Sequence, residues 1–87
     1  MEELLAEILK AQTLPHFTDV VKKNSGLYDS YYQIDTCYTV DHGWESMVFA
    51  CDANGKVSSY SDFDCDRYDS EEEARVGHDA MVAKWSH

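Results

Sequence analysis

The chain is poor in basic residues. Seven Lys and Arg stand against 17 Asp and Glu among 87 residues, so the formal net charge is −10 at pH 7. A protein that binds nucleic acid neutralises phosphates with Lys and Arg, so we expect no direct nucleic-acid partner. The same shortage disfavours anionic membrane surfaces. A basic protein surface or a cation suits this charge better.

Cysteine is also scarce, and Cys37, Cys51 and Cys65 are widely spaced. A secreted disulfide framework uses an even and dense set of cysteines. Structural zinc sites usually draw ligands in close pairs, which disfavours a zinc site made from these three thiols and His42. No apolar stretch approaches the roughly 20 residues that span a bilayer. The acidic first residues do not resemble a signal peptide. We therefore expect a protein of the reducing cytoplasm with no membrane partner.

Motifs for catalysis are missing as well. The chain has no Gly-rich phosphate loop. Asp35, Cys37 and His42 are close in sequence around one predicted turn, but strand alternation does not force the thiol toward the imidazole. A chain of this size has little room for a pocket of enzyme size. The sequence predicts a non-enzymatic protein, without catalytic residues and without a cofactor.

Apolar side chains are abundant enough for one folded domain over residues 1–87. The composition is 44% hydrophobic and includes six Tyr, three Phe and two Trp. Apolar spacing predicts a short helix over residues 2–11, with Leu4, Leu5, Ile8 and Leu9 on one side. A second short helix is predicted after Pro15, with Phe17, Val20 and Val21 on its apolar side.

Strand signals follow from residue 31 onward. Aromatic and β-branched residues predict strands over 31–40, 44–51 and 57–60, the last one resuming near Phe63. Asn54-Gly55 is a strong hairpin signal. The apolar run 47–51 predicts a central strand that is covered on both faces, by other parts of the chain or in a homodimer.

The last element predicted is a helix that begins at Ser70 with a capping box. Its buried stripe is Ala74, His78, Met81 and Trp85, and Gly77 lets it approach the sheet closely. The fold class is therefore α+β, with short N-terminal helices, a three-stranded antiparallel β-meander and a C-terminal helix packed on the sheet.

The segment over residues 62–73 is the most informative one, because seven of its twelve residues are acidic. One interpretation is a strand that runs into the capped helix. Another is a calcium loop, because oxygen-bearing residues fall at the ligand positions 1, 3, 5, 9 and 12 of an EF-hand. These residues are Asp62, Asp64, Asp66, Ser70 and Glu73. The match fails at Arg67, where the loop requires Gly, and at Asp69, where it requires an apolar residue.

The third interpretation is an anionic face for a basic partner. A strand here would point Asp62, Asp64 and Asp66 outward and turn Phe63 and Cys65 toward the core. Tyrosines are favoured at interfaces, since they combine contact area with a polar group. The predicted partner-binding residues are Asp62, Asp64, Asp66, Asp69, Glu71, Glu72, Tyr31 and Tyr38. The alternative is a solvated surface that keeps a small protein soluble.

Residues 43–52 (GWESMVFACD), 67–74 (RYDSEEEA) and Gly77-His78 resemble a family of small uncharacterised proteins from phages and prophages of Gram-positive bacteria. The resemblance implies a phage or mobile-element setting, where small acidic proteins often bind and block a host protein. Our leading hypothesis is an acidic protein-binding module, such as an inhibitor of a basic or nucleic-acid-binding host protein. A calcium-binding module is the alternative, and a small enzyme is the third.

Overall fold

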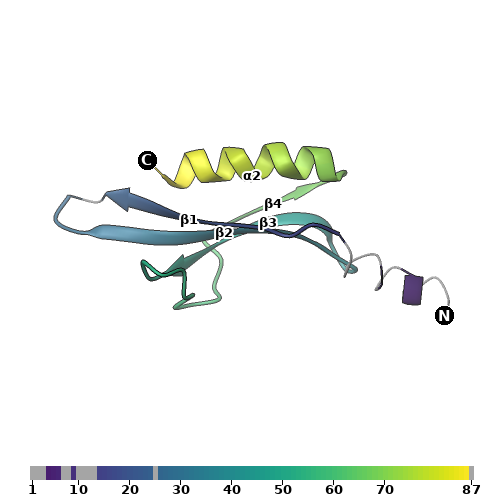
Figure 1. Cartoon of the computed structure of the whole chain (residues 1–87), viewed down its shortest axis with the longest axis horizontal. Helices are drawn as coiled ribbons and strands as arrows, with labels where there is room; N and C mark the ends of the chain where they lie inside the picture. The colour runs from purple at the N-terminus through teal and green to yellow at the C-terminus, as the bar shows by residue number, and fades with distance from the viewer. Residues whose placement is uncertain (1–3, 7–8, 10–13, 25, 87) are drawn as a thin grey trace.

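The computed structural model describes residues 4–6, 9, 14–24 and 26–86. They include the strands β1 (Phe17–Asn24), β2 (Asp29–Thr39), β3 (Gly43–Cys51) and β4 (Asp64–Tyr68), followed by the helix α2 (Glu71–Trp85). The strands form one antiparallel sheet in the order β1-β2-β3-β4, and α2 lies across one face (Figure 1). The α+β class is confirmed, with four strands in place of the three predicted. Among the described residues, no helix is long and apolar enough to cross a bilayer.

The predicted second helix is wrong, because residues 17–24 form the edge strand β1. It pairs with β2 in a register that places Val21 opposite Tyr32. Val21 thereby joins Ile34, Val48 and Met81 in the buried core. The apolar spacing of this short segment fits a helix or a strand, and only pairing with β2 selects the strand. Most of the predicted helix over 2–11 lies outside the described residues; residues 4–6 and 9 are helical.

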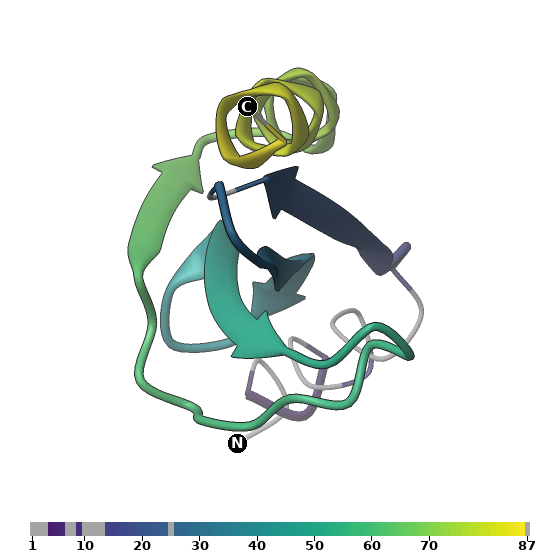
Figure 2. The same cartoon turned by 90° about the vertical axis from the view of Figure 1, so that its left-hand side faces the viewer.

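β2 and β3 are close to the predicted strands, but the predicted strand over 57–60 is wrong. The Asn54-Gly55 turn forms, and the Gly55 N–H donates to the Asp52 carbonyl over 3.0 Å. Val57 then makes a single bridge to Cys51. Residues 58–62 leave the sheet and pass along the face opposite α2 (Figure 2). We call this face of the sheet the loop face. The Phe63 ring then packs against Tyr32 and Trp85 on the α2 side before β4 begins.

β3 is covered on both faces, as its apolar run predicts. Val48 is fully buried toward α2. Phe49 points to the loop face, where the Tyr60 ring lies with its centroid 5.6 Å away. The 52–63 connection therefore supplies this cover within the chain itself.

The helix stripe is confirmed. Ala74, His78 and Met81 are buried, and the Trp85 ring packs with its centroid 4.9 Å from that of Tyr32. The predicted close approach at Gly77 is confirmed too, because a Cβ placed there would lie only 2.1 Å from the Tyr68 ring. α2 is thus held tightly against the sheet near its N-terminal half.

Candidate functional site

The acidic segment begins with β4, whose side chains point in the opposite sense from the prediction. Asp64 and Asp66 share one face, as the period of two requires, but it is the face that α2 covers. Asp64 accepts hydrogen bonds from Lys84 Nζ over 2.6 Å and from Trp85 Nε1 over 3.1 Å. Cys65 points away from the helix and is exposed. The prediction was wrong because alternation groups side chains by face without saying which face is buried.

These contacts also perturb the acidity of Asp64. The hydrogen bond from Lys84 is the main cause that lowers the pKa of this carboxyl, and those from Trp85 and the Cys65 N–H add to it. Desolvation acts in the opposite direction and is outweighed. Asp64 therefore anchors the end of α2 to β4 and is not a free charge for a partner.

The second part of the segment starts α2 by the predicted capping box. Ser70 Oγ accepts a hydrogen bond from the Glu73 N–H over 3.2 Å. Glu73 Oε2 accepts one in return from the N–H of Asp69 over 3.1 Å, one residue before the cap. Glu71 pairs with Arg75 over 3.1 Å along the helix surface. Glu71 and Glu73 thus stabilise the first turn.

The calcium hypothesis loses its geometric support here. Asp64 is bound by Lys84, while Ser70 and Glu73 serve the helix cap. Over the described part of the chain, Asp62, Asp64, Asp66 and Glu73 form no group whose ligand atoms could converge on one ion. A calcium ion needs six to eight converging oxygens, which this extended segment does not supply.

What remains at the surface is an open hollow between β4 and the start of α2. Its volume is about 540 Å³, and its lining residues are Tyr68, Ser70, Glu72, Glu73, Val76 and Gly77. We call it the acidic hollow. Val76 is 68% exposed at this place. Asp62, Asp66, Asp69 and Glu72 are exposed carboxylates of the same segment.

The two predicted tyrosines do not belong to the acidic hollow. Tyr31 lies on the loop face opposite Cys51, and Tyr38 lies on the helix face beside Trp44. Their odd spacing along β2 puts them on different faces. Both are half-buried, whereas Tyr28 and Tyr60 are the strongly exposed tyrosines. Alternation along the strand predicted over residues 31–40 was therefore enough to place these two tyrosines on opposite faces.

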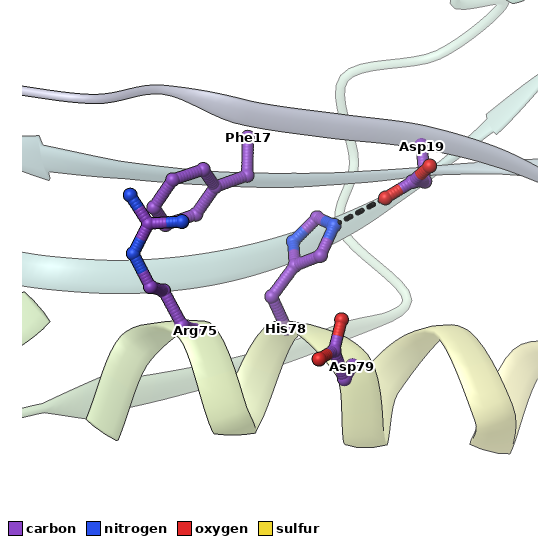
Figure 3. A pocket seen from close by; sticks show the side chains of 5 residues that line it. All are labelled: Phe17, Asp19, Arg75, His78 and Asp79. Atoms are coloured by element: carbon purple, nitrogen blue, oxygen red, sulfur yellow. Dashed lines mark hydrogen bonds and ion pairs between the residues drawn. The ribbon is translucent and has the colours of Figure 1, made fainter. Parts of the chain in front are cut away.

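A chain of hydrogen-bonded polar side chains, exposed at Asp19 and buried at its centre, connects α2 with all four strands. His78 Nε2 bonds to Asp19 Oδ2 over 2.7 Å (Figure 3), and His78 Nδ1 shares a hydrogen bond of 2.6 Å with Thr36 Oγ1. Thr36 and Ser46 share a further bond of 2.5 Å, and the Tyr68 hydroxyl donates to Ser46 over 3.1 Å. Sequence analysis placed His78 on the buried stripe but missed these partners, because the strand register brings them together.

The order carboxylate, imidazole, hydroxyl is that of a hydrolytic triad. Thr36 and Ser46 are completely buried, however, so no substrate carbonyl can approach either hydroxyl. The chain of hydrogen bonds therefore satisfies buried polar groups and links α2 to the sheet. It supplies no nucleophile.

A hollow of about 320 Å³ adjoins this network between β1 and α2. Phe17, Asp19, Arg75, His78 and Asp79 line it (Figure 3). The Arg75 guanidinium lies 4.3 Å from the centre of the Phe17 ring. The positive charge of Arg75 interacts with the Phe17 ring and with the carboxylate of Glu71. Among its lining residues, the hollow therefore offers no unpaired cation to an anionic ligand.

A third group of chemically active side chains lies on the loop face. His16 Nε2 contacts Asp35 Oδ1, and the Cys37 sulfur completes a set whose three ligand atoms all lie within 4.8 Å of one another. Of Asp35, Cys37 and His42, which lie close together in the sequence, only the first two belong to this group, and its imidazole comes from His16. His42 is exposed in the turn after β2. No local sequence signal placed His16 in this group, because only the pairing of β1 with β2 brings it beside Cys37.

Cys37 is not an activated nucleophile. Burial raises the pKa of its thiol, and the carboxylates of Asp35 and Glu45 raise it further. A reactive cysteine needs a lowered pKa. Cys51 and Cys65 also have raised pKa values, mainly through burial, and neither belongs to the His16 group among the described residues.

No protein-family model matches the chain, and searches of curated proteins and of solved structures return no match. The resemblance of residues 43–52, 67–74 and Gly77-His78 to phage and prophage proteins therefore stays a prediction.

Proposed function

We propose that the protein is a small acidic protein-binding module and that the acidic hollow is its contact surface. The observation that carries the proposal is the combination of exposed Glu72 with the exposed side chain of Val76 in one open hollow. Interfaces gain affinity from apolar anchors, while charge complementarity gives specificity and speeds association. A basic protein surface with an apolar side chain at its centre fits this arrangement.

The base of the hollow is tied to the core by packing and a hydrogen bond, which favours binding without rearrangement. The Tyr68 ring is in contact with Gly77, and the Tyr68 hydroxyl is bonded to Ser46 in the core. Preorganised surfaces lose less conformational entropy on association. The hollow is also open. It can be contacted by a protein surface, but it would not enclose a small substrate as an enzyme pocket does.

The buried and protonated nucleophiles favour a binding role over an enzymatic one. Thr36 and Ser46 are inaccessible, and Cys37 has a raised thiol pKa. In the phage setting that the resemblance implies, the module would act in the host cytoplasm and block a basic or nucleic-acid-binding host protein.

The experiment is a capture of partners from host lysate, followed by affinity measurements on two charge-matched variants. Asp69→Lys combined with Glu72→Lys reverses one carboxylate that lines the hollow and one exposed carboxylate between its lining residues Tyr68 and Ser70. Asp41→Lys combined with Asp79→Lys reverses two exposed carboxylates elsewhere and leaves the same net charge. We expect the first variant to lose at least about tenfold in affinity, chiefly through slower association at low salt. The control should bind nearly as the original protein does.

Val76→Ser tests the apolar part of the same surface and should speed dissociation. Equal losses in both double variants would mean that net charge, not this hollow, attracts the partner. Full binding by the Asp69 and Glu72 variant would reject the hollow as the contact surface.

A further inference from the structure

The pairing of β1 with β2 creates the His16, Asp35 and Cys37 group on the loop face. Asp35 and Cys37 are two residues apart on β2, so they point to the same side of the sheet. Phe17 pairs with Thr36, which brings the preceding residue, His16, beside Cys37. Three different ligand atoms, a nitrogen, an oxygen and a sulfur, thereby meet at one place.

We propose that His16, Asp35 and Cys37 bind one divalent transition-metal ion of the zinc type. Imidazole nitrogen, thiolate sulfur and carboxylate oxygen are all common zinc ligands, whereas calcium and magnesium prefer sets made only of oxygen. Three protein ligands leave a fourth tetrahedral position for water or for an external ligand.

The distances suit such an ion. Metal–ligand bonds of about 2.0–2.3 Å in a tetrahedron place ligand atoms about 3.3–3.8 Å apart. The three atoms here all lie within 4.8 Å of one another. His16 Nε2 and Asp35 Oδ1 are in direct contact and would separate to admit the ion; adjustments of about 1 Å, within reach of side-chain rotation, would bring the three atoms to these spacings.

The surroundings favour a cation independently of the three ligands. The Thr18 hydroxyl donates to Asp35 over 3.0 Å, the kind of outer contact that orients a metal-binding carboxylate. Glu45 lies opposite Cys37 on the neighbouring strand and is buried. Carboxylates of both Asp35 and Glu45 therefore lie on the same side of the sheet as the Cys37 sulfur. Arg67 reaches Glu45 only over 3.7 Å.

The site is also accessible and separate from the acidic hollow. His16 is exposed, so an ion can enter from solvent. The metal would tie the residue before β1 to the middle of β2 and would stabilise the folded protein according to its concentration. The fourth coordination position of the metal could be filled by water or by a ligand atom of a bound molecule.

The test is a titration of chelator-treated protein with zinc alone and with cobalt alone. We expect one equivalent to bind with a dissociation constant of micromolar order or lower, a rise in Tm, and thiolate-to-cobalt charge-transfer absorption. Losing an outer contact of a metal site already weakens binding roughly 10- to 100-fold. His16→Ala and Cys37→Ser should therefore each weaken binding at least about 100-fold, while His42→Ala and Cys65→Ser leave it unchanged.

His16→Ala is the decisive variant, because His16 is exposed and precedes β1, so its removal leaves the sheet intact; circular dichroism verifies this. Absence of saturable zinc binding, or unchanged binding in His16→Ala, would overturn the proposal. Equal loss in His42→Ala would indicate adventitious surface binding and would overturn it too. The variant with Asp69 and Glu72 reversed should still bind zinc, so a failure of the protein-binding proposal and a failure of this one are distinguishable.

Discussion

At Gly77 the helix α2 lies so close to the Tyr68 ring that a side chain has no room, and Gly77→Ala measures how tight that contact is. An alanine Cβ would lie 2.1 Å from Cε1 and 2.3 Å from Cζ of Tyr68. Overpacking of this kind costs about 1–3 kcal/mol. A displaced Tyr68 ring would also lose its hydrogen bond to Ser46, worth about 1 kcal/mol.

Helix propensity acts against these costs, since alanine is about 1 kcal/mol more favourable than glycine inside a helix. We therefore expect Gly77→Ala to lower the free energy of unfolding by about 1–3 kcal/mol. Urea unfolding followed by far-ultraviolet circular dichroism measures this value. A loss of about 1 kcal/mol would lower Tm by roughly 4–8 °C in a domain of this size.

Tyr68→Ala supplies the control, because it removes the ring that the new methyl group would meet. In that background Gly77→Ala should stabilise the protein by about 1 kcal/mol, so the sign of its effect reverses. Stabilisation by Gly77→Ala in the original protein would refute the reasoning. The same destabilisation with and without the Tyr68 ring would also refute it.

Two further predictions concern the buried polar chain and the acid response. Thr36→Val removes the hydroxyl that bonds to His78 Nδ1 and should destabilise the protein by about 1–3 kcal/mol; Thr18→Val, at an exposed site, should cost less, and equal costs in denaturant unfolding would contradict a structural role for the chain. The pKa of Asp64 is lowered in the folded state by its bond to Lys84, so this carboxylate stabilises the fold above its unfolded pKa of about 3.9, and the stabilisation fades as pH falls from there through the folded pKa. Asp64→Asn should therefore be less stable at neutral pH and approach the original protein below about pH 4; a stability difference that is independent of pH would contradict this assignment.

Local signals were sufficient for α2, β2 and β3. The capping box at Ser70 and the stripe through Ala74, His78 and Met81 lie within a few residues of one another, so the sequence alone identifies them. The same holds for the Asn54-Gly55 turn.

β1 and the site geometry depended on partners that are distant in sequence. Val21 is compatible with a short helix, and only pairing with Tyr32 makes it a strand residue of the core. The sequence predicted Asp64 as a free surface charge. In the structure it accepts a hydrogen bond from Lys84, which lies twenty residues later in the sequence. The position of His16 beside Asp35 and Cys37 could not be predicted, because it depends on the register in which β1 pairs with β2.

The sequence by itself determined the class of the fold, the negative charge and the helix that begins at Ser70, because composition, capping and periodicity are local properties. The tertiary structure decided which carboxylates are free. It turned Asp64 toward α2, engaged Glu73 in the cap and left Glu72 exposed beside Val76. The physical reason is that alternation along a strand sets which side chains share a face, while packing against the helix sets which face is buried.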